Sequence, residues 1–433
     1  MKLKKLATIA MTVVSVAALA ACGSKSDSKK EDTKKEANIV TEIKDDTTIT
    51  FWHAMNGAQE KALTKITEDF QKANPKIKVT LQNQQDYGSL QAKVNSTLQS
   101  PKDLPTISQA YPGWLYDASE NKQLVDLTPY MEDKTIGWGD QEKIKESLLD
   151  GAKINDVQYG IPFNKSTEAL FYNETILKQY GVKVPTTMEE LKEASKTIYE
   201  KSEGKVVGAG FDALSNYYLL GMKNEGVDVT KDTKFDSKES KDVVNYYADG
   251  VKDGYFRTPG SDKYMSVPFA SQKVAMFVGS IAGETYVAKD AKSAGFEYGV
   301  AVRPAKYNIQ QGTDVYMFSS ATDEQKTAAF LFMKYLSTPD VQLYWAQNTG
   351  YMPILDSVIK GKEYQASPNT KIPSILEKDT ENLISFPVTQ NSNAALNNTV
   401  RTIMENILSN SDKGDRDKMF TDGAKQLEDA WNQ

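Results

Sequence analysis

The spacing of apolar residues along the chain changes several times after residue 46. Residues 48–52 are rich in β-branched and aromatic side chains, which predicts a strand. Segment 59–73 has its apolar residues at helical spacing, which predicts a helix, and residues 77–81 alternate again and predict a second strand. A strand, a helix and a strand in this order favour a parallel sheet with helices on its faces.

Later segments repeat this alternation of strands and helices. Further strands are predicted at 205–211, 273–278 and 298–302. Capping boxes at 186–190 and at Thr322 with Gln325 predict two helix starts. A third helix is predicted to start at Pro339, and a late one is predicted around residues 400–407. The pattern as a whole predicts an α/β fold.

The first 46 residues differ in composition from the rest. Residues 1–5 are basic and residues 6–19 are apolar or small, which is typical of a secretory signal peptide over 1–21. The apolar run is too short for a bilayer span, which needs about 20 apolar residues. Leu19-Ala20-Ala21-Cys22-Gly23 resembles the bacterial lipobox, so we expect cleavage before Cys22 and a lipid on its sulfur.

The polar segment after Cys22 is predicted to be a disordered tether over residues 22–46, because it has little apolar surface to bury. We therefore expect an extracellular protein that a lipid anchors to the cell membrane of a Gram-positive bacterium. Removal of residues 1–21 leaves 412 residues, which is enough for two domains. It also removes three lysines, so the net charge falls from −6 to about −9. Because a nucleic-acid-binding protein has a basic face, we expect no nucleic-acid partner.

Several enzyme classes lack their residues in this sequence. His53 is the only histidine, and no Ser or Asp near it forms a known triad motif. Cys22 is the only cysteine, so zinc sites built from several His or Cys are excluded, and a GxxxxGK[ST] phosphate loop is absent. We expect no enzyme activity, no metal and no cofactor. Glycosidase activity is the enzyme class that the composition still allows, because it needs only two carboxylates.

The aromatic content fits a sugar-binding protein, with 22 Tyr, 15 Phe and 5 Trp. Aromatic rings cover the apolar CH faces of a sugar, and short polar groups bind its hydroxyls. Eight aromatic residues stand beside turn residues: Trp52, Tyr87, Tyr111, Trp114, Tyr116, Tyr217, Tyr218 and Tyr351. Each is a candidate sugar contact, and the alternative for each is an ordinary core or surface aromatic.

Five segments match a known family, and they occur in the family's order. They are Phe51-Trp52-His53-Ala54-Met55, Asn74-Pro75, Gly160-Ile161-Pro162-Phe163-Asn164-Lys165-Ser166-Thr167 with Leu170-Phe171-Tyr172-Asn173, Lys273-Val274-Ala275-Met276 with Gly279-Ser280, and Asn348-Thr349-Gly350-Tyr351-Met352-Pro353. With the lipobox, they resemble the extracellular solute-binding proteins of bacterial carbohydrate ABC importers. Within that family the motifs are most similar to those of the glycerol-3-phosphate-binding members.

The resemblance implies an α/β, two-lobed periplasmic-binding-protein-like fold with a ligand cleft between the lobes. Lobe 1 would comprise residues 47–160 and 305–352, and lobe 2 would comprise residues 161–304 and 353–433. The crossing segments would lie near residues 159–164, 302–304 and 351–353.

The resemblance also implies ligand contacts, which we combine with the aromatic and polar candidates. Family positions correspond to Tyr87, Ser166, Ser280, Gly312, Thr313 and Tyr351. The full expected ligand-binding set is Trp52, His53, Tyr87, Tyr111, Trp114, Asn164, Ser166, Asp212, Tyr217, Ser280, Gly312, Thr313, Tyr351 and Asn393. For Ser166 and Ser280 the alternative is a helix cap or a turn.

Two departures from the glycerol-phosphate pattern bear on the ligand. Pro112 stands where that group has a carboxylate, and Asn393 stands where it has an arginine for the phosphate. A phosphate clamp favours arginine, and this chain has only four, at positions 257, 303, 401 and 416. A neutral saccharide is therefore favoured, with glycerol 3-phosphate or a sugar phosphate as the alternative, for which Arg401 is available.

These features predict a monomeric receptor that captures a mono- or oligosaccharide and delivers it to the transmembrane subunits of an ABC permease. Two other classes stay open. A surface adhesion or scaffold lipoprotein would use exposed aromatic patches to bind a protein. A secreted glycosidase would hold two carboxylates about 5–10 Å apart across a pocket.

Overall fold

The computed structural model describes residues 39–433, and the predicted signal peptide and Cys22 lie outside them. Residues 39–46, the described part of the predicted tether, form no helix or strand, and Ile39 and Ile43 pack against the core. Within the described range no helix is both long enough and apolar enough to cross a membrane.

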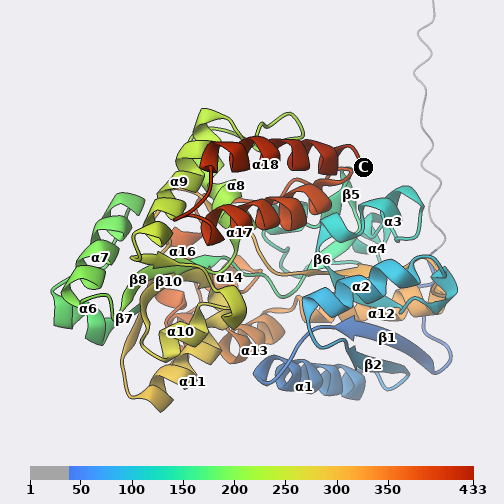
Figure 1. The fold of residues 1–433 in the computed structure, drawn as a ribbon. Helices are drawn as coiled ribbons and strands as arrows, with labels where there is room; N and C mark the ends of the chain where they lie inside the picture. The colour runs from blue at the N-terminus through green and yellow to red at the C-terminus, as the bar shows by residue number, and fades with distance from the viewer. Residues whose placement is uncertain (1–38) are drawn as a thin grey trace, which may run out of the picture. The chain divides into compact units, whose positions relative to one another are not determined.

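The first sheet has five strands in the order β2-β1-β3-β13-β6, of which β1, β2 and β6 are labelled in Figure 1. The bounds of these strands are β1 Thr47–His53, β2 Ile77–Asn83, β3 Ile107–Ala110, β6 Gly160–Pro162 and β13 Asp314–Met317. Strand β1 is parallel to β2 and β3, which confirms the predicted parallel start. Strand β13 is antiparallel to β3 and β6, so a late segment of the chain completes this sheet.

The second sheet also has five strands, in the order β11-β7-β10-β8-β9. Its strands are β7 Glu168–Asn173, β8 Val207–Phe211, β9 Phe256–Arg257, β10 Val274–Ser280 and β11 Tyr298–Val302. Strand β8 is parallel to β9 and β10, and β7 is antiparallel to β10 and β11. The three strands predicted from residues 205 to 302 are therefore all present, within two residues of their expected bounds.

Helices cover both sheets with their apolar faces. Next to the first sheet, α1 (Ala58–Ala73) packs against α12 (Asp323–Leu336) and α13 (Pro339–Thr349). Next to the second, α7 (Met188–Lys201) covers β8, and four helices pack on one another: α8 Leu214–Asn224, α9 Lys238–Lys252, α17 Arg401–Ser409 and α18 Arg416–Trp431. Helices α17 and α18 lie side by side in Figure 1.

Shorter elements complete the described part of the chain. They are α2 Tyr87–Thr97, α3 Tyr116–Glu120, α4 Thr128–Glu132, α5 Glu146–Asp150, β4 Lys153–Ile154, β5 Val157–Gln158, α6 Glu174–Tyr180, α10 Ser266–Ala270, α11 Glu284–Ala294, β12 Asn308–Ile309, α14 Asp356–Ile359, α15 Lys362–Gln365, α16 Pro373–Asp379 and β14 Leu383–Ile384.

The helix starts confirm the predicted capping. The Thr322 hydroxyl accepts from the Gln325 N–H at 3.3 Å, and the Gln325 side chain accepts from the Thr322 N–H at 3.0 Å. The predicted late helix is present as α17, and an unexpected π-helix over Asn393–Val400 directly precedes it. Such helices are rare, and nothing in the sequence predicts one here.

Segments between the two sheets run beside one another. Lys165 pairs with Met352 and Ser166 pairs with Gln311 in isolated antiparallel bridges. Three backbone hydrogen bonds of 2.8–2.9 Å hold these pairs. The segment after β6 is thereby fixed to two later segments of the chain. The exact lobe boundaries stay a prediction.

Candidate functional site

A cavity of about 350 Å³ opens beside the segment that follows β6. Its volume falls within the range of about 300–1,000 Å³ that is usual for small-molecule sites. Five members of the expected ligand-binding set line it, namely Tyr87, Tyr111, Trp114, Gly312 and Asn393. The structure therefore brings together residues that lie more than 300 positions apart in the sequence.

One wall of the cavity is aromatic. Tyr87 begins α2, and Tyr111 and Trp114 lie on the turn that follows β3. The ring centroid of Tyr111 is 5.8 Å from that of Tyr87 and 5.3 Å from that of Trp114. Such a wall can cover the apolar face of a sugar ring.

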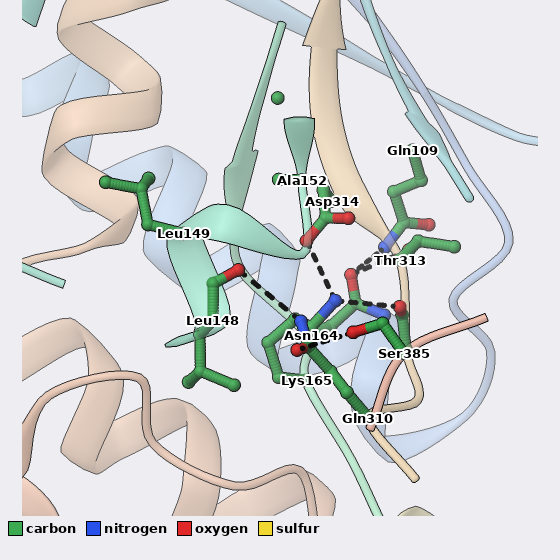
Figure 2. Close-up of polar contacts among 12 residues, drawn as sticks. Gln109, Leu148, Leu149, Ala152, Asn164, Lys165, Gln310, Thr313, Asp314 and Ser385 are labelled. Atoms are coloured by element: carbon green, nitrogen blue, oxygen red, sulfur yellow. Dashed lines mark hydrogen bonds and ion pairs between the residues drawn. The ribbon is translucent and has the colours of Figure 1, made fainter. Parts of the chain in front are cut away.

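A hydrogen-bond network holds the Tyr87 phenol in place. The hydroxyls of Tyr87 and Tyr351 lie 3.0 Å apart, and the Asn164 amide donates to the Tyr87 oxygen at 3.1 Å. Gln109 and Thr313 donate to the Asn164 side-chain oxygen at 2.8 and 2.9 Å (Figure 2). Burial raises the pKa of Tyr87 well above its usual value and that of Tyr351 to about 12, so both phenols stay neutral donors.

A buried ion pair supports the segment around Gly312. The Lys165 ammonium donates to Asp314 Oδ1 at 2.9 Å (Figure 2). It also donates to the Gly312 carbonyl at 3.1 Å. Burial raises the pKa of Asp314, and the Lys165 charge opposes that rise. Gly312 has φ +83°, and a Cβ at this position would lie 1.9 Å from the Asn164 carbonyl oxygen. The cavity wall here tolerates only glycine.

Amide side chains line another part of the cavity. Asn393, Asn397, Asn398 and Arg401 line the cavity from the π-helix and the first residue of α17. Asn397 donates to the Asn393 side chain at 3.0 Å. No Asp or Glu of residues 39–433 lines this cavity. The wall thus offers neutral donors and acceptors, together with the Arg401 guanidinium.

Other expected contacts lie in the shell around the cavity. Asn164, Thr313 and Tyr351 belong to the network behind Tyr87 and are buried. Ser166 and Ser280 are hydrogen-bonded to each other, with their hydroxyl oxygens 2.7 Å apart. None of these five residues lines the cavity wall.

Two expected contacts from β1 lie in the core rather than at the cavity. The Trp52 indole donates to Gln82 at 2.7 Å, and the Lys93 ammonium lies 4.4 Å from the centre of its ring. His53 is buried, and its ring nitrogen accepts from the Met55 N–H at 3.3 Å. Burial lowers the pKa of His53 to about 4 and the Glu60 carboxylate opposes this, so His53 is neutral at physiological pH.

The last two expected contacts belong to the surroundings of the second sheet. Asp212 accepts from the Met265 N–H at 2.5 Å, and burial raises its pKa to about 7. The Tyr217 hydroxyl donates to the Val243 carbonyl at 2.8 Å, and Tyr217 lines a separate cavity between α8 and α9. Neither residue lines the cavity described above.

Several cavity residues are absent from the expected set. They are Gln91, Lys165, Asn216, Gln310, Gln311, Asn397, Asn398 and the segment 385–388. The asparagine-rich run at 391–398 is the one sequence signal that could have found part of this wall. Lys165 lies within the family motif at 160–167, and the others come from segments without a distinctive pattern.

A buried cluster around Arg303 lies next to the cavity. Arg303 donates to Glu168 through Nε at 3.3 Å and to Asp379 through its backbone N–H at 3.0 Å. Asn216, which lines the cavity, donates to the other Glu168 oxygen at 2.8 Å. Burial, with a smaller contribution from Glu168, raises the pKa of Asp379 to about 7, although the bond from Arg303 opposes this.

Because the pKa of Asp379 is raised, we expect the stability of the protein to depend on pH. The folded protein keeps this proton at pH values where an unfolded Asp, with a pKa near 3.9, has lost it. Its contribution to stability is therefore complete below about pH 4 and is lost as the pH rises toward 7. Asp379→Asn removes this titration. As the pH rises from 5 to 8, the free energy of unfolding of the variant should therefore increase relative to that of the native protein, by at most about 1.4 kcal/mol per pH unit.

Urea unfolding at pH 5, 6.5 and 8 checks this expectation, with exposed Asp103→Asn as the control. A difference between Asp379→Asn and the native protein that stays constant over this range would contradict it.

No group of three or more His, Cys, Asp or Glu within the described range is placed to hold a metal ion. The cavity is lined by aromatic rings, amides, hydroxyls, backbone groups and two cationic side chains, those of Lys165 and Arg401.

Comparisons with known proteins agree with this architecture. Residues 65–372, more than half of the chain, match the family described as bacterial extracellular solute-binding protein. The chain is 25% identical over 333 residues to the sn-glycerol-3-phosphate-binding periplasmic protein UgpB of Salmonella typhimurium, covering 71% of this chain and 74% of the relative. It is 24% identical over 364 residues to the UgpB of Rhizobium meliloti, covering 76% and 80%.

Solved structures share the fold. An ABC substrate-binding protein from Listeria monocytogenes in complex with cycloalternan has a TM-score of 0.78 at 20% identity, covering 90% of this chain and 100% of that one. UgpB from Mycobacterium tuberculosis in complex with glycerophosphocholine has a TM-score of 0.76 at 20% identity, covering 89% and 98%. The predicted two-lobed α/β fold is confirmed. The chain belongs to the family of bacterial extracellular solute-binding proteins, the solute receptors of ABC importers.

Proposed function

We propose that this protein captures a neutral saccharide outside the cell and delivers it to the transmembrane subunits of an ABC permease. The observation that carries the proposal is the cavity, in which the aromatic wall of Tyr87, Tyr111 and Trp114 stands with an amide wall that includes Asn393 and Asn397. Aromatic rings suit the CH faces of a sugar and amides suit its hydroxyls.

The absence of carboxylates from the described cavity wall supports a binding role rather than catalysis. Glycoside hydrolysis needs two carboxyl groups on opposite sides of the scissile bond. We propose that the protein is not an enzyme. A surface adhesion or scaffold role would need a large exposed aromatic patch, whereas the aromatic wall described here lines a cavity.

A sugar phosphate or glycerol phosphate is the second candidate ligand, and Arg401 is the observation that favours it. Its guanidinium lines the cavity, and a guanidinium binds phosphate oxygens in a bidentate manner. The relatives named for sn-glycerol-3-phosphate point in the same direction. Lys165, the other cation at this cavity, is paired with Asp314, so the many neutral amides favour the saccharide.

We further propose that the protein acts as a monomer and that a lipid on Cys22 holds it at the outer face of the cell membrane. The proposal rests on the sequence around Cys22, which resembles a lipobox. Mass spectrometry of the protein from membranes of cells that express the full chain tests the anchor. A diacylglycerol mass on an N-terminal Cys22 is expected, and an unmodified Cys22 would contradict it.

A thermal-shift screen with sugars, polyols and sugar phosphates tests the proposed function. Ligand at about 100 times its Kd should stabilise the protein by about 2.7 kcal/mol. Stabilisation by glycerol 3-phosphate alone would select the second candidate. The absence of a shift with every compound would refute both.

Tyr111→Ala should weaken the binding of any sugar found in that screen by at least about tenfold, because it removes an aromatic surface from the centre of the wall. Isothermal titration calorimetry measures the effect. Tyr344→Ala is the matched control, since Tyr344 is 36% exposed and lines no described cavity. Equal affinities of the two variants would show that the wall does not touch the ligand.

A further inference from the structure

A second cavity, of about 690 Å³, borders the one described above. Both cavities are lined by Ser385 and Pro387, so the segment that contains these residues is their common boundary. On the side of the first sheet, Trp114 lines the first cavity and Tyr116, two residues later, lines the second. The aromatic wall therefore continues from one cavity into the next.

The second cavity has the chemistry of a saccharide site. Tyr116 and Trp431 line it from different helices, α3 and α18. The side chains of Gln390 and Asn432 add amide donors and acceptors. Aromatic surfaces together with neutral amides are the combination that covers the faces and the hydroxyls of a sugar.

The indole N–H of Trp431 is buried and lacks a partner among the described residues, 39–433. Trp431 as a whole is 9% exposed. Buried indole N–H groups usually have a partner. Tyr116 is only half-buried, and it packs against the same core cluster as Trp114. Of the charged residues at this cavity, Lys223 and Asp228 neutralise each other at 2.5 Å and Lys231 is exposed.

We propose that the second cavity is an additional saccharide subsite and that the ligand is an oligosaccharide whose chain passes Ser385 from the first cavity to the second. The inference rests on the proposed function and narrows it from sugars in general to extended ones. Tyr116 is a specificity-determining residue for ligand length, because only those sugar units that extend beyond the first cavity contact its ring.

The test compares short and extended sugars in matched pairs by isothermal titration calorimetry: maltose with maltotetraose, cellobiose with cellotetraose, and raffinose with stachyose. The native protein should bind the extended member of at least one pair tenfold or more tightly than the short member. Tyr116→Ala should abolish that preference and leave the affinity for the short member unchanged. Tyr116→Phe keeps the ring and should keep the preference.

Trp431→Phe provides a second measurement, since it replaces the indole by a smaller ring and so reduces the aromatic surface at this cavity. It should reduce the preference for the extended sugar, with a cooperative thermal unfolding transition as the control for folding. Equal affinities of the native protein for both members of every pair would overturn the inference while leaving the proposed function intact. So would a length preference that survives in Tyr116→Ala. If the native protein binds none of the six sugars and no other sugar in the screen, both the subsite inference and the proposed function are overturned.

Discussion

Lys165→Met should lower the free energy of unfolding by about 3–5 kcal/mol at neutral pH, because it leaves a buried carboxylate without its counter-ion. Lys165 and Asp314 are 2% and 0% exposed, and their charged atoms lie 2.9 Å apart (Figure 2). After the substitution, the described residues offer Asp314 only the distant Tyr316 hydroxyl, at 3.5 Å. Urea unfolding followed by circular dichroism measures the loss.

Two further variants separate the buried charge from the lost packing. Lys165→Met combined with Asp314→Leu should recover most of the stability, because replacing both members of a buried pair by apolar residues is often neutral. Lys153→Met removes a partner of Asp150 from an exposed pair and should have a much smaller effect. A loss in Lys165→Met no larger than that in Lys153→Met would show that the ion pair does not hold this segment.

The spacing of apolar residues was sufficient to predict the first two strands and the helix between them. Residues 48–52 and 77–81 correspond to β1 and β2, and 59–73 corresponds to α1. These elements have one buried face, and burial of one face imposes the periodicity that can be recognised in a sequence. The capping residues Thr322 and Gln325 were equally informative, because their hydrogen bonds are local.

The residues that line the cavity were only partly predictable, because most of them are not marked by a local sequence pattern. Tyr87, Tyr111 and Trp114 follow strands or begin helices, so their position beside turns indicated a role outside the core. Asn216 and Asn398 come from helical segments that meet the cavity only through tertiary packing. No local pattern distinguishes such residues from other polar residues on a helix.

Trp52 illustrates the limit of reasoning from residue type. Its place at the end of a strand, within a family motif, favoured a ligand contact. In the structure its ring is 5% exposed, packs in the core and donates to Gln82 on the neighbouring strand. An aromatic residue at a strand end serves packing as readily as binding, and only the register of β1 with β2 distinguishes the two roles.

Gly312→Ala should weaken ligand binding at least tenfold and lower the free energy of unfolding by about 3–4 kcal/mol, at the upper end for a point substitution. The added Cβ would lie 1.9 Å from the carbonyl oxygen of Asn164, so the two backbone segments must move apart. Gly312 lines the cavity, and Asn164 donates to the Tyr87 phenol at 3.1 Å. The displacement therefore reaches the aromatic wall as well as the backbone beside the ligand.

Gly226→Ala is a matched control for this substitution. Gly226 has the same φ of +83°, but no atom lies within 4 Å of the position that its Cβ would take. It should show only the strain of a non-glycine residue in the left-handed region, about 1 kcal/mol, with unchanged binding. Calorimetric titration with a sugar from the thermal-shift screen and urea unfolding of both variants separate the two effects. If the two alanine variants lose the same stability and retain the same affinity, the close approach of Gly312 to Asn164 does not shape the site, and only the backbone conformation requires glycine there.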